Sequence, residues 1–79
     1  MSKPKYFIES GNDAKLLRYK LGINQSEFWS RISVTQSGGS RYESGRSLPK
    51  PVRLLLHLAY APEKQAMAIL KKLRQTEKG

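Results

Sequence analysis

The chain has 79 residues and no cysteine, which allows one small domain and excludes disulfides and thiolate metal sites. Fifteen Lys and Arg against six Asp and Glu give a formal net charge of +9, and such a basic balance favours a polyanionic partner, most often nucleic acid. Its apolar runs are too short to cross a bilayer and residues 1–9 lack the apolar core of a signal peptide, so we expect a soluble, cytoplasmic protein that does not bind membranes.

The N-terminal part predicts an extended arm followed by a helix. Residues 1–10 have no helical period, and Tyr6, Phe7 and Ile8 either fasten this arm onto the body or pair with another copy in a dimer. Asn12 or Ser10 can cap a helix that continues to residue 21 and ends at Gly22. Its inner face is expected to carry Leu16, Leu17 and Leu21.

Two short helices are predicted next. Asn24 is a cap with Glu27 three residues later, so a helix is expected over residues 25–32, with Phe28, Trp29 and Ile32 facing inward. After a turn at residues 33 and 34, Thr35 caps a further helix over residues 36–44, which Gly45 closes.

Two prolines mark the remaining helices. Pro51 opens a fourth helix that ends near residue 61, with Val52, Leu55, Leu58 and Ala59 on its inner stripe. Leu54 and Leu56 lie beside this stripe, so the helix has apolar surface left for a dimer contact. Pro62 starts a fifth helix, in which Ala66, Ile69, Leu70 and Leu73 recur at helical spacing. The chain is therefore predicted to be all-α, with about five helices.

The second and third helices have the form of a helix-turn-helix, in which two short helices are joined by a turn of three or four residues. On a helical wheel Gly39 and Tyr42 point away from a polar face of four residues: Gln36, Ser37, Ser40 and Arg41. These side chains suit base edges in a DNA groove, because Gln pairs with adenine, Arg with guanine and Ser with either. Three more polar residues lie at helix N-termini, which attract phosphate: Asn24, Gln25 and Thr35.

The stretch from Ala14 to Pro49 resembles the Cro/C1 (XRE-type) helix-turn-helix family of phage and bacterial regulators. The resemblance is carried by "LGINQSEF" and "VTQSGGSRYESGR". It implies a lambda-repressor-like bundle in which Gln36, Ser37 and Arg41 reach base edges and Gln25 holds phosphate and braces Gln36. It also implies backbone contacts from Thr35, Asn24, Ser44 and Arg46, and a partly buried ion pair between Arg18 and Glu43.

Three departures from that family concern the contact between its two short helices. Trp29 stands where a small residue is usual, Ser33 where the turn usually has Gly, and Gly39 where Ile or Val is usual. Because a buried indole needs room on the facing helix, we predict that Trp29 packs over Gly38 and Gly39. The alternative is an exposed Trp29, with the two glycines admitting a close approach of DNA.

These patterns predict one DNA-binding domain over residues 1–79, with an arm at 1–10, a helix-turn-helix at 24–45 and C-terminal helices at 51–75. The expected function is sequence-specific binding of a double-stranded DNA operator by a homodimer, as a transcriptional regulator whose repressor role follows from the resemblance alone. We expect no cofactor, metal or small-molecule ligand, since His57 stands alone, and no enzymatic activity, since no catalytic motif is present. The alternatives are a protein-binding helical module, such as an antitoxin or phage accessory protein, and a nonspecific nucleic-acid chaperone.

Overall fold

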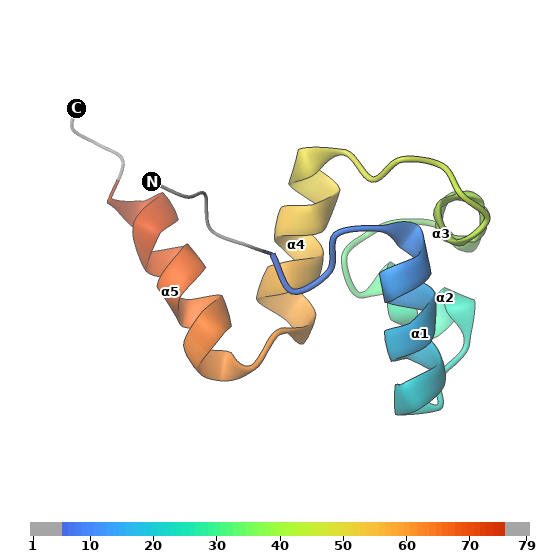
Figure 1. Ribbon diagram of the computed structural model, residues 1–79, viewed down its shortest axis with the longest axis horizontal. Helices are drawn as coiled ribbons and strands as arrows, with labels where there is room; N and C mark the ends of the chain where they lie inside the picture. Colours follow the sequence, from blue (N-terminus) through green and yellow to red (C-terminus); the bar gives the residue numbers. More distant parts are fainter. Residues whose placement is uncertain (1–5, 76–79) are drawn as a thin grey trace.

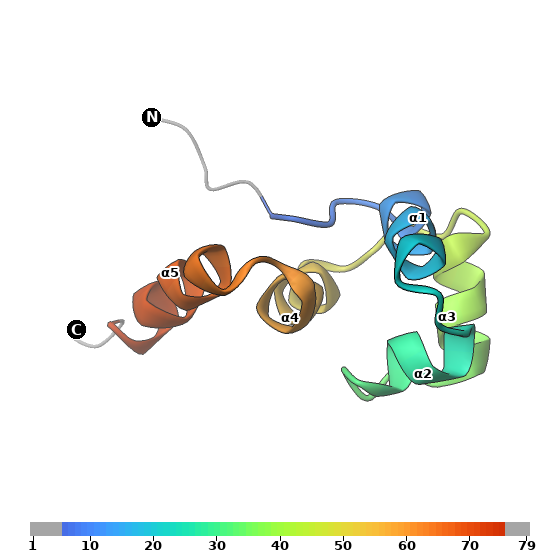
Figure 2. The ribbon, with the colours of Figure 1, turned by 90° about the horizontal axis from the view of Figure 1, so that it is seen from below.

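Five helices and no strand make up residues 6–75, the part of the chain that the computed structural model describes. They are α1 (Gly11–Leu21), α2 (Gln25–Ser30), α3 (Gln36–Glu43), α4 (Lys50–Tyr60) and α5 (Glu63–Arg74). Helices α1, α2 and α3 form one cluster, α4 lies beside this cluster, and α5 packs on the far side of α4 (Figure 1, Figure 2). The predicted all-α class with five helices is confirmed.

Side-chain caps set the start of the first three helices. Ser10, rather than Asn12, caps α1 by accepting a hydrogen bond from the backbone N–H of Asp13 at 3.1 Å. Asn24 and Thr35 cap α2 and α3 as predicted. Helix α2 ends at residue 30, two residues earlier than predicted, because residues 31–33 form a turn.

The core lies where α1, α2 and α4 meet beneath the arm. Its buried apolar side chains are Ile8, Ala14, Phe28, Trp29, Ile32, Leu48 and Leu56. An aromatic contact joins α4 to α2, since the rings of Phe28 and Tyr60 stack at 4.4 Å between centroids and 8° between planes. The Tyr60 hydroxyl also donates to the Phe28 carbonyl at 2.8 Å. The prediction that Phe28, Trp29 and Ile32 face inward is confirmed.

The predicted inner face of α1 is largely wrong. Leu16 is 58% exposed and Leu21 is 48% exposed, while Leu17 is half-buried and Ala14 is fully buried. The reason is a close approach of the start of α1 to α3, which leaves room only for small residues. A Cβ atom on Gly11 would overlap the backbone carbonyl of Tyr42. Close helix contact therefore selects small side chains in a place where the sequence pattern favoured leucine.

The predicted inner stripe of α4 is also wrong in part. Val52 packs against the core as expected, but Leu55 and Ala59 are exposed, and the buried residues are Leu56 and His57. The prediction that Leu56 lies on a surface free for a dimer contact is therefore wrong, because its side chain is part of the core. Because five of the residues between 52 and 58 are aliphatic, the sequence permits more than one stripe. The structure selects the i, i+4, i+8 series of Val52, Leu56 and Tyr60 toward the core.

Helix α5 follows the prediction more closely. Ala66 is buried, Ile69 and Leu70 are half-buried, and Leu73 is 41% exposed. The helix packs against α4. It therefore extends the bundle along one side.

The described part of the arm is fastened onto the body. Ile8 is 1% exposed within the core, and the Tyr6 ring meets the His57 ring edge-on at 5.7 Å between centroids. This arrangement agrees with the first of the two roles considered for Tyr6, Phe7 and Ile8. The rest of the predicted arm, residues 1–5, lies outside the described residues.

Candidate nucleic-acid interface

The turn between α2 and α3 brings the two helices into the arrangement of a helix-turn-helix. Backbone N–H groups of Ile32 and Val34 both donate to the Trp29 carbonyl, at 3.1 and 3.0 Å. Ser33 sits between them at φ 64, in the left-handed region that non-glycine residues rarely adopt. This backbone explains why glycine is usual at this position in the motif, and it marks Ser33 as a strained residue.

Helix α3 has one face toward solvent and one toward the protein. Gln36, Ser37 and Arg41 are exposed and Ser40 is half-buried, whereas Gly39 and Glu43 are buried. The four residues predicted to contact bases therefore lie together on the outward side of one helix. Within residues 6–75 the Arg41 guanidinium has no hydrogen bond or ion pair, so it is free to engage another molecule.

The inward face of α3 is shaped by a contact between Gly39 and Trp29. Trp29 is 0% exposed, so the alternative of an exposed indole is wrong. A Cβ atom on Gly39 would lie 2.7 Å from the indole Nε1 and would overlap Cγ and Cδ1. Gly38 takes no part in this contact, contrary to prediction, because a Cβ there would meet only Val34 and Thr35, at 3.3 and 3.4 Å. Gly39 alone makes room for the indole.

The carboxylate of Glu43 is the common acceptor of side chains from α1 and α2. Arg18 donates to it through Nε and Nη2, both at 2.9 Å, which is the ion pair implied by the resemblance. Gln25 Nε2 donates at 3.1 Å and Trp29 Nε1 at 2.8 Å. The side chains of Glu43 and Arg18 are only 3% and 11% exposed. The end of α3 is thus fixed to both preceding helices by four charge-assisted hydrogen bonds.

Two opposing effects act on the pKa of Glu43. Burial raises the pKa by disfavouring the charged form, but hydrogen bonds from Arg18, Trp29 and Gln25, with the charge of Arg18, together lower the pKa below its usual 4.5. The pKa of Arg18 is raised, chiefly by its hydrogen bond to Glu43. The site is therefore held as a charged pair at neutral pH.

The residues predicted to contact phosphate lie at or near the ends of α2 and α3. Asn24 and Thr35 use a side-chain oxygen for capping, at 2.8 Å from the Glu27 nitrogen and 3.1 Å from the Gly38 nitrogen. Gln25 donates to Glu43, and no hydrogen bond joins it to Gln36 within the described residues. The Ser44 hydroxyl donates to the Ser40 carbonyl at 2.9 Å, and Arg46 is exposed in the loop after α3. Their phosphate contacts stay predictions.

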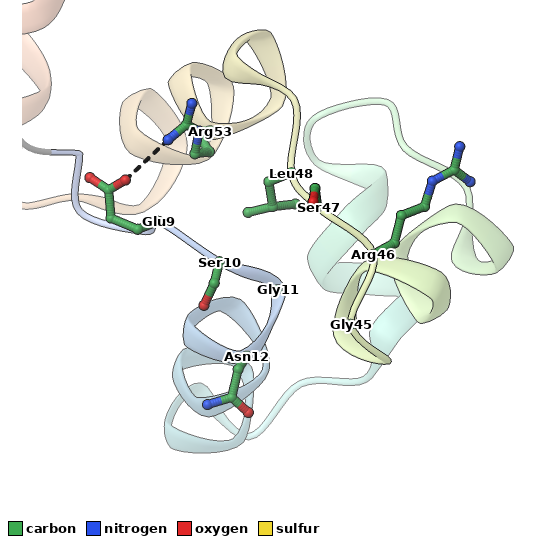
Figure 3. A pocket seen from close by; sticks show the side chains of 9 residues that line it. All are labelled: Glu9, Ser10, Gly11, Asn12, Gly45, Arg46, Ser47, Leu48 and Arg53. Carbon is green, nitrogen blue, oxygen red and sulfur yellow. Dashed lines mark hydrogen bonds and ion pairs between the residues drawn. The ribbon is translucent and has the colours of Figure 1, made fainter.

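A shallow cavity of about 440 Å³ lies between the start of α1 and the loop after α3. The Glu9–Arg53 ion pair, at 3.2 Å, closes one side, and the Arg46 side chain points away from the opening (Figure 3). The Arg53 Nε atom is buried and has no hydrogen-bond partner among residues 6–75. Within residues 6–75 there is no group of three His, Asp or Glu side chains that could hold a metal, and no helix with the length and apolarity to span a bilayer.

Two features of the site were missed by sequence reasoning. One is Gly11, whose missing side chain lets α1 meet the backbone of Tyr42. The other is the hydrogen bond from the Trp29 indole to Glu43. For the Gly11 contact, the sequence offers only a weak signal, a glycine directly after a capping serine. The hydrogen bond to Glu43 could not be predicted, because the sequence does not show that the buried indole reaches the last turn of α3.

Comparison with known families agrees with this geometry. The model of the RsaL-like HTH domain family matches residues 15–59, which are more than half of the chain and include α2, α3 and nearly all of α4. Searches among curated proteins and among solved structures gave no significant match. The match supports a helix-turn-helix family without singling out the Cro/C1 branch. The chain belongs to the RsaL-like helix-turn-helix domain family.

Proposed function

We propose that this protein is a transcriptional regulator that binds a specific double-stranded DNA sequence by placing α3 in the major groove. The observation that carries the proposal is the division of α3 into two faces. Its inward face is fixed by Gly39 and Glu43, and its outward face presents Gln36, Ser37 and Arg41. A rigid helix with unpaired polar side chains on its solvent side suits direct reading of base edges.

Charge and helix ends support the remaining contacts with DNA. The net charge of +9 favours the phosphate backbone, and Arg46 is exposed close after α3. The backbone N–H groups at the starts of α2 and α3 are additional phosphate ligands, positioned by Asn24 and Thr35. Binding of this kind needs no catalysis or cofactor, and a cytoplasmic location gives access to DNA.

We further propose a homodimer that pairs two α3 helices across a two-fold operator, about 34 Å apart along the DNA. Leu55 on α4 and Met67 on α5 are 43% and 50% exposed, and the two helices pack against each other. A second copy covering both side chains would bury apolar surface that the monomer leaves in water. Repression follows if such a dimer blocks a promoter, and the motif similarity to Cro/C1 regulators supports that role.

The test is selection from a random duplex library at about 150 mM salt, near physiological ionic strength. An enriched inverted repeat is expected. Enrichment of a single half-site would support specific DNA binding and contradict the homodimer. No enrichment would contradict specific DNA binding and favour a protein partner, for which Leu16 and Tyr19 on α1, 58% and 59% exposed, offer apolar surface.

Substitution of Arg41 tests the reading helix directly. Arg41→Ala is expected to cost about 1–3 kcal/mol at one operator position and to relax the base preference there. Lys71→Ala removes the same charge from exposed α5 and is the matched control, expected to weaken all sequences slightly and equally. If Arg41→Ala lowers the affinity for every DNA sequence equally, Arg41 contacts phosphate and not a base.

A further inference from the structure

The one histidine of the chain is buried at the junction of three segments. His57 lies on α4 and is 2% exposed. Its Nδ1 atom is 2.9 Å from the backbone nitrogen of Phe7 in the arm, and its Nε2 atom is 3.1 Å from the backbone carbonyl of Gln65 on α5. One imidazole therefore joins the arm and α5 to α4.

These two partners determine the protonation state of the ring. A backbone N–H can only donate, so Nδ1 must be the unprotonated acceptor, and a carbonyl can only accept, so Nε2 must carry the proton. Both positions are satisfied by the neutral Nε2–H tautomer. A second proton on Nδ1 would face the Phe7 N–H with another donor and break the bond to the arm.

We infer that His57 is a positioning residue whose neutral imidazole holds the arm and α5 in place on α4, and that its protonation releases the arm. Protonation at Nδ1 leaves the Nε2 proton in place, so the bond to the Gln65 carbonyl and the attachment of α5 persist. Met67, two residues further along α5, therefore keeps its position, and the release concerns the arm alone. The inference does not depend on the proposed function.

The charged and titratable groups around the ring come from all three segments. From the arm, Tyr6 meets the ring edge-on, and Glu9 pairs with Arg53, one turn before His57 on α4. The Arg53 guanidinium lies 5.9 Å from the centre of the Tyr6 ring. The first turn of α5 brings Glu63 and Lys64, both exposed. Both direct hydrogen-bond partners of the imidazole are backbone groups, so no carboxylate in the described chain is bonded to the ring to hold a second proton.

The experiment is nuclear magnetic resonance of the full chain, labelled with nitrogen-15 and free of DNA. Long-range proton–nitrogen correlations at pH 7.5 are expected to show the proton on Nε2 and a bare Nδ1. As the pH is lowered to 5.5, the hydrogen-exchange protection factor of the Phe7 amide is expected to fall in step with the appearance of the second proton in the ring nitrogen shifts, with about a tenfold loss for the fully charged ring, as for loss of one hydrogen bond. The Gly39 amide, bonded to the Thr35 carbonyl at 2.9 Å, is the internal control and should keep its protection.

A conservative substitution separates titration from packing. His57→Gln keeps a donor and an acceptor but carries no charge at either pH, so its Phe7 amide should show the same protection at pH 7.5 and 5.5. His57→Leu should leave that amide unprotected at both. The inference is overturned if the proton is found on Nδ1, if the His57→Gln variant shows the wild-type pH effect, or if Phe7 and Gly39 lose protection together. Because no DNA is present, these outcomes are independent of the proposed operator binding.

Discussion

Adding a single methyl group at Gly39 should destabilise the protein. In an exposed helix the change from Gly to Ala gains about 1 kcal/mol. Here the new Cβ would overlap the indole of Trp29, so either α3 must move away from α2 or the ring must turn. Overpacking of this kind costs about 1–3 kcal/mol, and a turned ring would also lose its bond to Glu43. We expect Gly39→Ala to lower the free energy of unfolding by about 1–2 kcal/mol.

Gly38→Ala is the matched control, because the neighbouring Cβ meets only Val34 and Thr35 at tight but passable distances. We expect it to be neutral or to stabilise by up to about 1 kcal/mol. Urea unfolding of both variants is followed by circular dichroism. Tryptophan fluorescence is unsuitable, because the one tryptophan, Trp29, is substituted in the backgrounds described next. In a Trp29→Leu background Gly39→Ala should lose most of its cost, whereas Trp29→Phe, which keeps a ring there, should retain it. Equal costs in all three backgrounds would refute a steric role for Trp29.

The remaining predictions concern the buried carboxylate and the turn. Glu43→Gln should cost about 3 kcal/mol in urea unfolding, because it leaves the Arg18 charge buried without its partner; an unchanged midpoint would show that the ion pair contributes nothing. Because the folded-state pKa of Glu43 is lowered, its stabilisation is complete above pH 4.5 and is lost as the pH falls through the folded pKa, so wild type should lose more stability than Glu43→Gln between pH 6 and pH 3. Ser33→Gly should stabilise the protein by about 0.5 kcal/mol, since it relieves the left-handed strain but raises the conformational entropy of the unfolded chain. Ser33→Val, which is β-branched, should destabilise it by about 1 kcal/mol. Thermal unfolding of both variants measures the difference, and the opposite order of stability would contradict a strained Ser33.

Local signals in the sequence predicted the helix-turn-helix well. Asn24 and Thr35 are caps with strong sequence preferences, and Gly45 ends α3 at φ 124, so the limits of α2 and α3 followed within two residues. The contact of Trp29 with Gly39 was also predictable, because a large indole at the contact between two helices requires a small residue on the facing helix. DNA contacts of the outward residues of α3 remain predictions.

Features that depend on how helices cross were not predictable from periodicity. The leucines of α1 suggested an inner face, yet Leu16 is exposed, whereas Gly11 makes the close contact with α3 and Ala14 is buried in the core. The aliphatic run in α4 gave no unique stripe, and burial of His57 depends on the arm and α5, both distant in sequence. The spacing of residues along the chain also does not reveal that the Glu43 carboxylate accepts hydrogen bonds from side chains on two other helices.

The separation of the two faces of α3 bears on how such a protein can change its target. Gln36, Ser37 and Arg41 are exposed, and their side chains make no hydrogen bond within residues 6–75, so replacing them should leave the free energy of unfolding nearly unchanged. Gly39 and Glu43, by contrast, tolerate little variation. Under the proposed function, mutations can therefore change the DNA sequence that is bound along one side of a single eight-residue helix while the other side keeps the helix in place. Divergence of binding specificity among duplicated copies of such a gene would then proceed without an intervening loss of folding.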